Sequence, residues 1–287
     1  MNHGRGNLAV FFLLLIMNLL NESYTGALDR KSLIDLEIPT QWNNQIVLFI
    51  HGFMGFKDWG AWHLVQAYYV ERGYGFCKFN LSHNGAILAS SQDFPDKEAF
   101  AKNRYSYEVE DVKRAYKWIE NKCNPGIFHL IGHSRGGGIA ILVARFLPKV
   151  KSVITWAAIC SIENRFPIGE ELDKWRQDGV RFVQNTRTRE SLPQYYSLYT
   201  DFEQQKEALS IEHAIKSLAI TCCIIHGTKD EAVSIEEGRQ LATWRNIKVH
   251  EISEANHVFG ASHPYNLPNL PLHLEQVCAL TLGVVKG

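Results

Sequence analysis

The sequence lacks the excess of charge that proteins use to bind nucleic acids or anionic membranes. Its 287 residues include 30 basic and 30 acidic side chains, so the formal net charge at pH 7 is zero. Without a charge excess, no long-range field steers the whole molecule toward phosphate backbones or anionic lipid. A nucleic-acid partner is therefore not expected.

Glycine and proline are also few, with 21 and 9 residues, which excludes a fibrous chain. A hydrophobic content of 46% and an aromatic content of 11% exclude a disordered one. No internal repeat or low-complexity linker divides the sequence. Since single α/β domains reach about 250 residues, one domain is the simplest organisation.

The six cysteines show neither the paired spacing of a zinc site nor a disulfide framework. Cys222 and Cys223 are adjacent in an apolar run, where they would point to opposite faces of a strand. We expect buried free thiols and no metal site.

No apolar run is long enough to span a membrane. The longest, residues 8–20, follows His3 and Arg5 and precedes a polar stretch with small residues. A spanning helix needs about 18 apolar residues, whereas this order of basic, apolar and small residues is typical of a secretory leader.

The leader is predicted to cover residues 1–27, because Thr25 and Ala27 are small residues suited to a cleavage site. Residues 28–287 would then form the globular domain, and the protein would be exported. Two alternatives stay open. The segment could be retained as a membrane anchor, or the start codon could be wrongly extended, in which case the protein would be cytoplasmic.

Strand and helix patterns alternate from Ser32 onward, which predicts repeated βαβ units. Short apolar runs typical of strands buried on both faces are Gln45–Ile50, Gly75–Phe79, Ile127–Ile131, Val150–Trp156 and Ala219–Ile225. Amphipathic helices are predicted at Arg104–Asn121, Ile139–Leu147, Ile235–Trp244 and Leu270–Leu282. The predicted fold is α/β, with a mostly parallel sheet flanked by helices.

One segment, about residues 160–213, is too long for a simple crossover. It comes after the predicted strand Val150–Trp156, which we take as the sixth strand of the fold. We interpret it as a cap with a helix near Glu170–Gln177, a hairpin through Val180–Thr186 and Gln194–Thr200, and a helix near Phe202–Ser210. Its aromatic residues Trp175, Tyr195 and Tyr199 are candidates for substrate binding. Alternatively, the segment is a surface excursion that never meets a ligand.

Gly132-His133-Ser134-Arg135-Gly136 matches the pattern G-x-S-x-G. It directly follows the apolar run Ile127–Ile131 and precedes a helical pattern, which is the strand–turn–helix setting of a nucleophile elbow. Such a turn strains the serine backbone, and side chains at Gly132 and Gly136 would clash. Ser134 is the predicted nucleophile.

A serine hydroxyl needs a base, and the base needs an acid to orient it, in the chain order Ser, acid, His for this type of elbow. Asp230 follows the predicted strand Ala219–Ile225, and His257 follows the strand-like Lys248–Ile252. We therefore predict Asp230 as the acid and His257 as the base. The competing residues are Glu231, Glu163 and His263.

The oxyanion hole is predicted from two backbone N–H groups. His51-Gly52-Phe53-Met54-Gly55 follows the strand Gln45–Ile50, which places Phe53 as the first donor. The residue after the nucleophile, Arg135, supplies the second. His51 is interpreted as ordering this loop.

These residues together resemble the α/β-hydrolase superfamily from about residue 32 to the end of the chain. The segments HGFMGFKDWG, GHSRGG, HGTKDEAV and ANHVF are similar to small esterases of the feruloyl/cinnamoyl and dienelactone-hydrolase-like kind. The resemblance implies hydrolysis of a small carboxylic ester through an acyl-enzyme, with no metal or organic cofactor. The loop Asn80–Gly85 departs from the family pattern D-x-R-G-x-G, so the wall near the oxyanion hole can differ.

Two other functions stay open at this point. A peptidase of the oligopeptidase type uses the same three residues, although such enzymes usually carry an additional propeller domain or a much larger chain. The second open function is that of a non-catalytic binding protein with the same fold. The sequence specifies neither the acyl group, the alcohol nor the oligomeric state.

Overall fold

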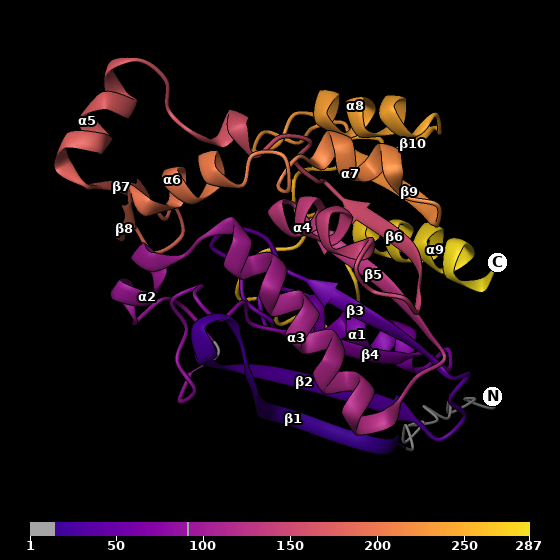
Figure 1. Cartoon of the computed structure of the whole chain (residues 1–287). Coiled ribbons are helices and arrows are strands. Elements are labelled where there is room, and N and C mark those ends of the chain that lie inside the picture. Colours follow the sequence, from indigo (N-terminus) through magenta and orange to yellow (C-terminus); the bar gives the residue numbers. More distant parts are fainter. Residues whose placement is uncertain (1–14, 91) are drawn as a thin grey trace, which may run out of the picture.

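Within the described residues, the short apolar runs predicted as strands form the centre of an eight-stranded sheet (Figure 1). The computed structural model describes residues 15–90 and 92–287. In spatial order the strands are β1 (Leu15–Thr25), β2 (Lys31–Pro39), β4 (Gly75–Phe79), β3 (Gln45–Ile50), β5 (Ile127–His133), β6 (Val150–Trp156), β9 (Thr221–Gly227) and β10 (Val249–Ile252). Neighbours from β4 to β10 pair in parallel, whereas β1 and β2 are antiparallel.

Both faces of the sheet are buried under helices. In β3, Ile46 and Leu48 pack into one apolar core, while the alternating Val47 and Phe49 pack into the other. The first core contains side chains of α3 (Tyr105–Cys123), α4 (Arg135–Ala144), α7 (Ile211–Ser217) and α8 (Ile235–Arg245). The second contains those of α1 (Trp62–Val70) and α9 (Leu272–Lys286). The predicted fold class, a mostly parallel sheet flanked by helices, is confirmed.

Because β3, β5, β6, β9 and β10 run parallel, the loops that follow them open at one edge of the sheet. This edge therefore brings together the residues that were predicted for catalysis, although they are far apart in the sequence.

The N-terminal strand β1 falls within the segment predicted as a leader. It pairs antiparallel with β2, and its buried Tyr24 donates a hydrogen bond of 2.8 Å to the carbonyl of Asn80. His3, Arg5 and the first part of the apolar run lie outside the described residues. Cleavage after Ala27 would remove the whole of β1, and the leader stays a prediction. Within the described residues, no helix is both long and apolar enough to cross a membrane.

The segment after the sixth strand projects beyond the sheet, at the upper left of Figure 1. It consists of η2 (Glu163–Arg165), α5 (Glu170–Asp178), the hairpin of β7 (Val180–Gln184) and β8 (Ser191–Tyr195), and α6 (Ser197–Gln204). The prediction of a helix followed by a hairpin is confirmed. The second strand, however, was predicted at Gln194–Thr200, where α6 begins, and the last helix lies earlier than the predicted Phe202–Ser210. We call this part of the chain the cap, and its hairpin packs beside α2 (Lys97–Lys102).

Candidate active site

Ser134 occupies a strained turn between β5 and α4. Its backbone angles are φ 57° and ψ −124°, a region that side-chain-bearing residues rarely adopt. A Cβ atom at Gly132 would lie 2.3 Å from the carbonyl oxygen of Gly136, and one at Gly136 would lie 2.3 Å from that of Ile50. The predicted clash at both glycines is confirmed, since only glycine lets strand and helix approach this closely.

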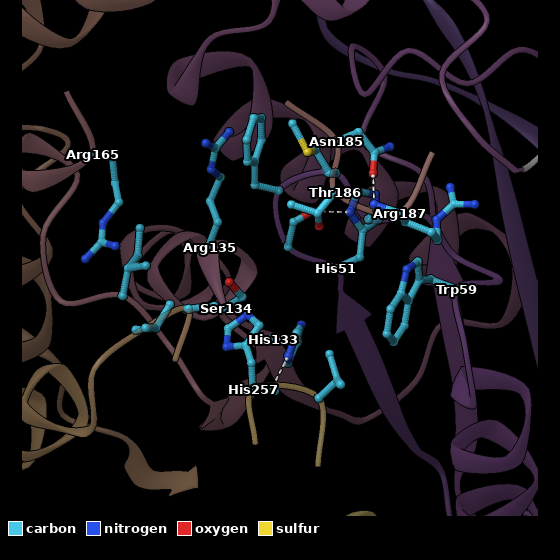
Figure 2. Close-up of a pocket in the computed structure, with 18 of the residues that line it drawn as sticks. His51, Trp59, His133, Ser134, Arg135, Arg165, Asn185, Thr186, Arg187 and His257 are labelled. Carbon is cyan, nitrogen blue, oxygen red and sulfur yellow. Dashed lines mark hydrogen bonds between the residues drawn. The ribbon is translucent and has the colours of Figure 1, made fainter. Parts of the chain in front are cut away.

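Ser134 and His257 line the same pocket, which has a volume of about 420 Å³ (Figure 2). The walls come from the loop after β3, the start of α4, the cap, and the loops after β9 and β10. No hydrogen bond joins Ser134 Oγ to His257 among the described residues; in such sites this bond often shortens only when substrate binds.

His257 contacts Asp230, the acid predicted for it. The distance from His257 Nδ1 to Asp230 Oδ2 is 2.8 Å, and the Asp230 side chain is wholly buried. The other carboxylate oxygen accepts hydrogen bonds from the N–H groups of Ala232 and Val233, at 2.9 and 2.8 Å. Burial alone would raise the pKa of Asp230, but the hydrogen bonds from His226 and His257 outweigh it and hold that pKa below its ordinary value. The carboxylate is therefore ionised at neutral pH.

His226 is a second imidazole on the same carboxylate. Its Nε2 lies 3.1 Å from Asp230 Oδ2 and 2.9 Å from the carbonyl oxygen of Val233. Two acceptors at one nitrogen require that Nε2 carries the proton. The signal in the sequence was the spacing of four residues between His226 and Asp230 around a turn.

The competing residues lie elsewhere. Glu163 is exposed and pairs with Lys206, and Glu231 is exposed. The ring of His263 accepts a hydrogen bond of 2.9 Å at Nδ1 from the N–H of Gly60. None of the three lines the pocket of Ser134.

The two predicted oxyanion donors flank Ser134. A Cβ atom at Gly52 would lie 2.8 Å from the Cβ of Ser134, so the loop that carries Phe53 passes directly beside the serine. The structure gives no hydrogen-bond partner to the N–H of Phe53 or Arg135 within the described residues. Neither N–H group is therefore engaged by another part of the described chain.

His51 holds the loop that carries Phe53. Its Nε2 accepts the N–H of Leu81 at 3.1 Å, so the proton resides on Nδ1, which donates to the carbonyl of Gly52 at 2.9 Å. Burial lowers the pKa of His51 to about 4, which keeps the ring neutral. The interpretation of His51 as a residue that orders the loop agrees with this geometry.

The side chain of Arg135 connects the two donors. Its guanidinium carbon lies 4.1 Å from the centroid of the Phe53 ring, and Nη1 donates to Glu108 Oε1 at 3.2 Å. Both Arg135 and Glu108 are buried. A guanidinium group and the face of an aromatic ring attract each other. This contact therefore restrains Phe53 relative to the start of α4. The sequence pattern had suggested only the backbone N–H of Arg135.

The loop Asn80–Gly85, where the sequence departs from the family pattern, contacts the segment that follows β3. Asn80 Oδ1 accepts the N–H of Lys57 at 2.6 Å. The ammonium of Lys57 binds Asp35 and Asp58, at 2.8 and 2.7 Å, and that of Lys78 binds the same two carboxylates. This group of four charges, of which only Asp58 is partly exposed, ties the segment after β3 to β2 and β4.

The three cap aromatics predicted to bind substrate do not line the pocket of Ser134. Trp175 is buried inside the cap, where Nε1 donates to the carbonyl of Gln194 at 2.9 Å. Tyr195 donates to Glu98 at 2.6 Å, and Tyr199 packs edge-on against Phe166 at 5.1 Å between ring centroids. Trp175 and Tyr199 therefore pack the cap itself, whereas Tyr195 joins the hairpin to α2. The cap residues that do reach the pocket are Arg165, Asn185, Thr186 and Arg187.

Replacing Trp175 by alanine is therefore expected to destabilise the protein by about 3–5 kcal/mol, the usual cost of removing a buried tryptophan. The ranking of acetyl, octanoyl and feruloyl esters should stay unchanged, because the side chain does not contact the pocket. The measurements are Tm and kcat/KM for the three esters. Phe182→Ala, on the exposed side of the same cap, serves as the control and should leave Tm nearly unchanged. A changed substrate ranking in Trp175→Ala would return this residue to the binding site.

Comparison with known proteins agrees with this architecture. A family model described as "alpha/beta hydrolase fold" matches residues 45–198. A curated relative is monoacylglycerol lipase ABHD6 of Rattus norvegicus, which is 23% identical over 256 residues, covering 76% of this chain and 71% of the relative.

Solved structures with a similar fold include two esterases and a putative hydrolase. Est1E from Butyrivibrio proteoclasticus with ferulic acid bound has a TM-score of 0.69 and 16% identity, covering 91% of this chain and 97% of that one. The esterase domain of a Rhodothermus marinus protein has a TM-score of 0.56 and 18% identity, covering 83% and 89% of the two chains. A putative hydrolase from Agrobacterium vitis S4 has a TM-score of 0.68 and 13% identity, covering 93% and 98%. At these identities the likeness is one of fold.

Proposed function

The chain belongs to the α/β-hydrolase family, and we propose that it is a serine hydrolase that cleaves carboxylic esters with Ser134, His257 and Asp230. The observation that carries the proposal is the 2.8 Å contact between His257 Nδ1 and the buried Asp230 carboxylate, in a pocket that also contains the strained Ser134. A carboxylate on Nδ1 fixes that proton and leaves Nε2 of His257 as the base that faces the serine.

The proposed reaction has two halves. Ser134 Oγ attacks the acyl carbon while His257 Nε2 takes the hydroxyl proton, and the carbonyl oxygen becomes an oxyanion bound by the N–H groups of Phe53 and Arg135. The C–O bond to the alcohol then breaks, and the alcohol leaves with the proton from His257. In the second half, water gives a proton to His257 and attacks the acyl-enzyme, which releases the acid and restores Ser134.

Ester substrates are supported by the names of the relatives, which include esterases and a monoacylglycerol lipase. The same three residues would also serve a peptidase, and a binding protein could keep the fold without the chemistry. Purified protein assayed with p-nitrophenyl esters of graded length, methyl ferulate and a peptide p-nitroanilide separates the three. We expect ester turnover and reaction with a fluorophosphonate. Cleavage of the anilide alone would favour the peptidase, and neither turnover nor labelling would favour the binding protein.

The expectation of export depends on the pattern of residues 1–27 alone and stays a prediction.

A further inference from the structure

The pocket of Ser134 has cationic side chains on its walls and no anionic ones. Among the described residues, its lining includes Arg135, Arg165 and Arg187 but no aspartate or glutamate. Burial lowers the pKa of two lining histidines, His51 to about 4 and His133 to about 3, so both are neutral. Three guanidinium groups therefore carry positive charge on these walls at neutral pH.

Two of the three arginines are neutralised from within the protein. Arg135 pairs with Glu108, and both side chains are almost completely buried. Arg165 pairs with Glu237, whose side chain is 14% exposed and also accepts the N–H of Cys160 at 2.9 Å. Each of these carboxylates is enclosed by protein and has a further role in holding the backbone or a neighbouring helix.

Arg187 differs from the other two arginines, because the carboxylate that it pairs with is exposed to solvent. It pairs with Asp93, and the Asp93 side chain is 51% exposed. Ion pairs that are this accessible to solvent contribute little, since water and salt screen them. Arg187 can therefore exchange Asp93 for another anion at little cost. In Figure 2, Arg187 is seen on the opposite side of Ser134 from Arg165.

The same turn holds an unused hydrogen-bond donor. Asn185 is 5% exposed, and its amide oxygen accepts the N–H groups of Arg187 and Thr188, at 3.1 and 3.4 Å (Figure 2). These two bonds fix which end of the amide is oxygen. The amide nitrogen is buried and has no partner among the described residues. The enclosed Asn185 side chain therefore acts on the turn through its oxygen, which holds the backbone of Arg187 in place.

We propose that the turn 185–187 of the cap binds a negatively charged group on the substrate, so that the preferred substrates are esters that also carry a carboxylate or phosphate. This inference rests on the proposed ester hydrolysis. Arg187 supplies the charge and the planar pair of donors that suits such groups, and Asn185 holds the turn that carries Arg187. Ser134 acts on the ester carbonyl while the charged group is held at the far end of the pocket. A volume of about 420 Å³ is within the range of pockets for small ligands.

The test compares matched esters with and without a negative charge. On the acyl side, the mono-p-nitrophenyl ester of adipic acid is compared with p-nitrophenyl hexanoate. On the alcohol side, 3-(4-acetoxyphenyl)propanoate is compared with its primary amide. We expect the anionic member of at least one pair to have a kcat/KM that is about tenfold higher or more. A hydrogen bond to a charged group contributes a gain in binding of this size. The pair that shows the preference identifies the side of the ester that carries the charge.

Two variants locate the effect. Arg187→Gln should remove the preference by lowering kcat/KM of the anionic ester to about that of the neutral ester in the same variant. Arg189→Gln removes the same charge from the same hairpin at a residue outside the pocket, and it should keep the preference. Loss of the preference in both variants, or neutral esters cleaved as well as anionic ones in the wild type, would overturn the proposal.

A binding measurement keeps this inference separate from the proposed function. Adipate itself should raise Tm of the wild type and of Arg189→Gln by mass action, but not that of Arg187→Gln. If no ester is hydrolysed and adipate still binds through Arg187, the proposed reaction fails while the anion site stands. If neutral esters are hydrolysed and adipate raises no Tm, the anion site fails while the reaction stands.

Discussion

Ser134→Ala is expected to lower kcat for p-nitrophenyl acetate by about five orders of magnitude and to abolish labelling by a fluorophosphonate, because no other group would supply the attacking oxygen. The remaining rate would come from the oxyanion donors and from substrate binding, which this substitution leaves in place. The fold should survive. The Ser134 hydroxyl makes no hydrogen bond within the described residues, and alanine keeps the Cβ that packs beside Gly52.

The control for this variant is Ser161→Ala, which changes a serine outside the pocket. It should keep full labelling, and both variants should keep the wild-type Tm within a few degrees. Undiminished labelling of Ser134→Ala would move the nucleophile to another residue, and we would withdraw the proposed reaction.

The central sheet was predictable from the sequence because its strands are buried on both faces. Continuous apolar runs such as Gln45–Ile50 and Val150–Trp156 match β3 and β6 residue for residue. The edge strand β1 was not, although the opposite edge strand β10 coincides with the strand-like run Lys248–Ile252. Residues 15–25 have the composition of a leader, and nothing local indicates that they pair with β2. Propensity and leader patterns describe one segment at a time, whereas strand pairing at an edge depends on a distant partner.

The cap shows where short patterns become ambiguous. The segment 194–200 contains three tyrosines and fits a strand by propensity, yet α6 begins at Ser197 and buries Leu198 and Phe202. Aromatic and polar residues at this spacing fit a strand face and a helix face almost equally well over so few positions. Packing against the rest of the cap decides between them, and a single sequence does not contain that information.

The contact between Asp230 and His257 followed from topology, because parallel strands end at one edge and the chain order of the elbow is known. No such rule predicts which residues of the cap line the pocket. Arg187 and Asn185 reach it only because the β7–β8 hairpin packs beside α2, and this docking is a tertiary event. The cap aromatics misled for a related reason, since a cluster of rings looks the same in sequence whether it packs a cap or lines a pocket.

Asp230→Asn is expected to lower kcat by up to about 10⁴-fold, and the contacts around the carboxylate explain why an amide of the same shape fails. Oδ2 faces the protonated nitrogens of His257 and His226, while Oδ1 accepts the N–H groups of Ala232 and Val233. Every neighbour is a donor. Either orientation of an asparagine side chain therefore places its NH₂ group against an N–H.

The substitution has two possible ways to relieve this conflict, and both impair the base. If the NH₂ group faces His257, the imidazole keeps its proton on Nε2 and no longer accepts one from Ser134. If it faces Ala232 and Val233, the turn that holds the side chain loses two hydrogen bonds. The measurements are kcat, kcat/KM and Tm for Asp230→Asn beside Glu231→Gln and Glu163→Gln. The two glutamine variants should retain most of the activity, since neither side chain lines the pocket. If Glu163→Gln proves to be the severe change, the acid follows β6 instead of β9, and Asp230 is a structural residue.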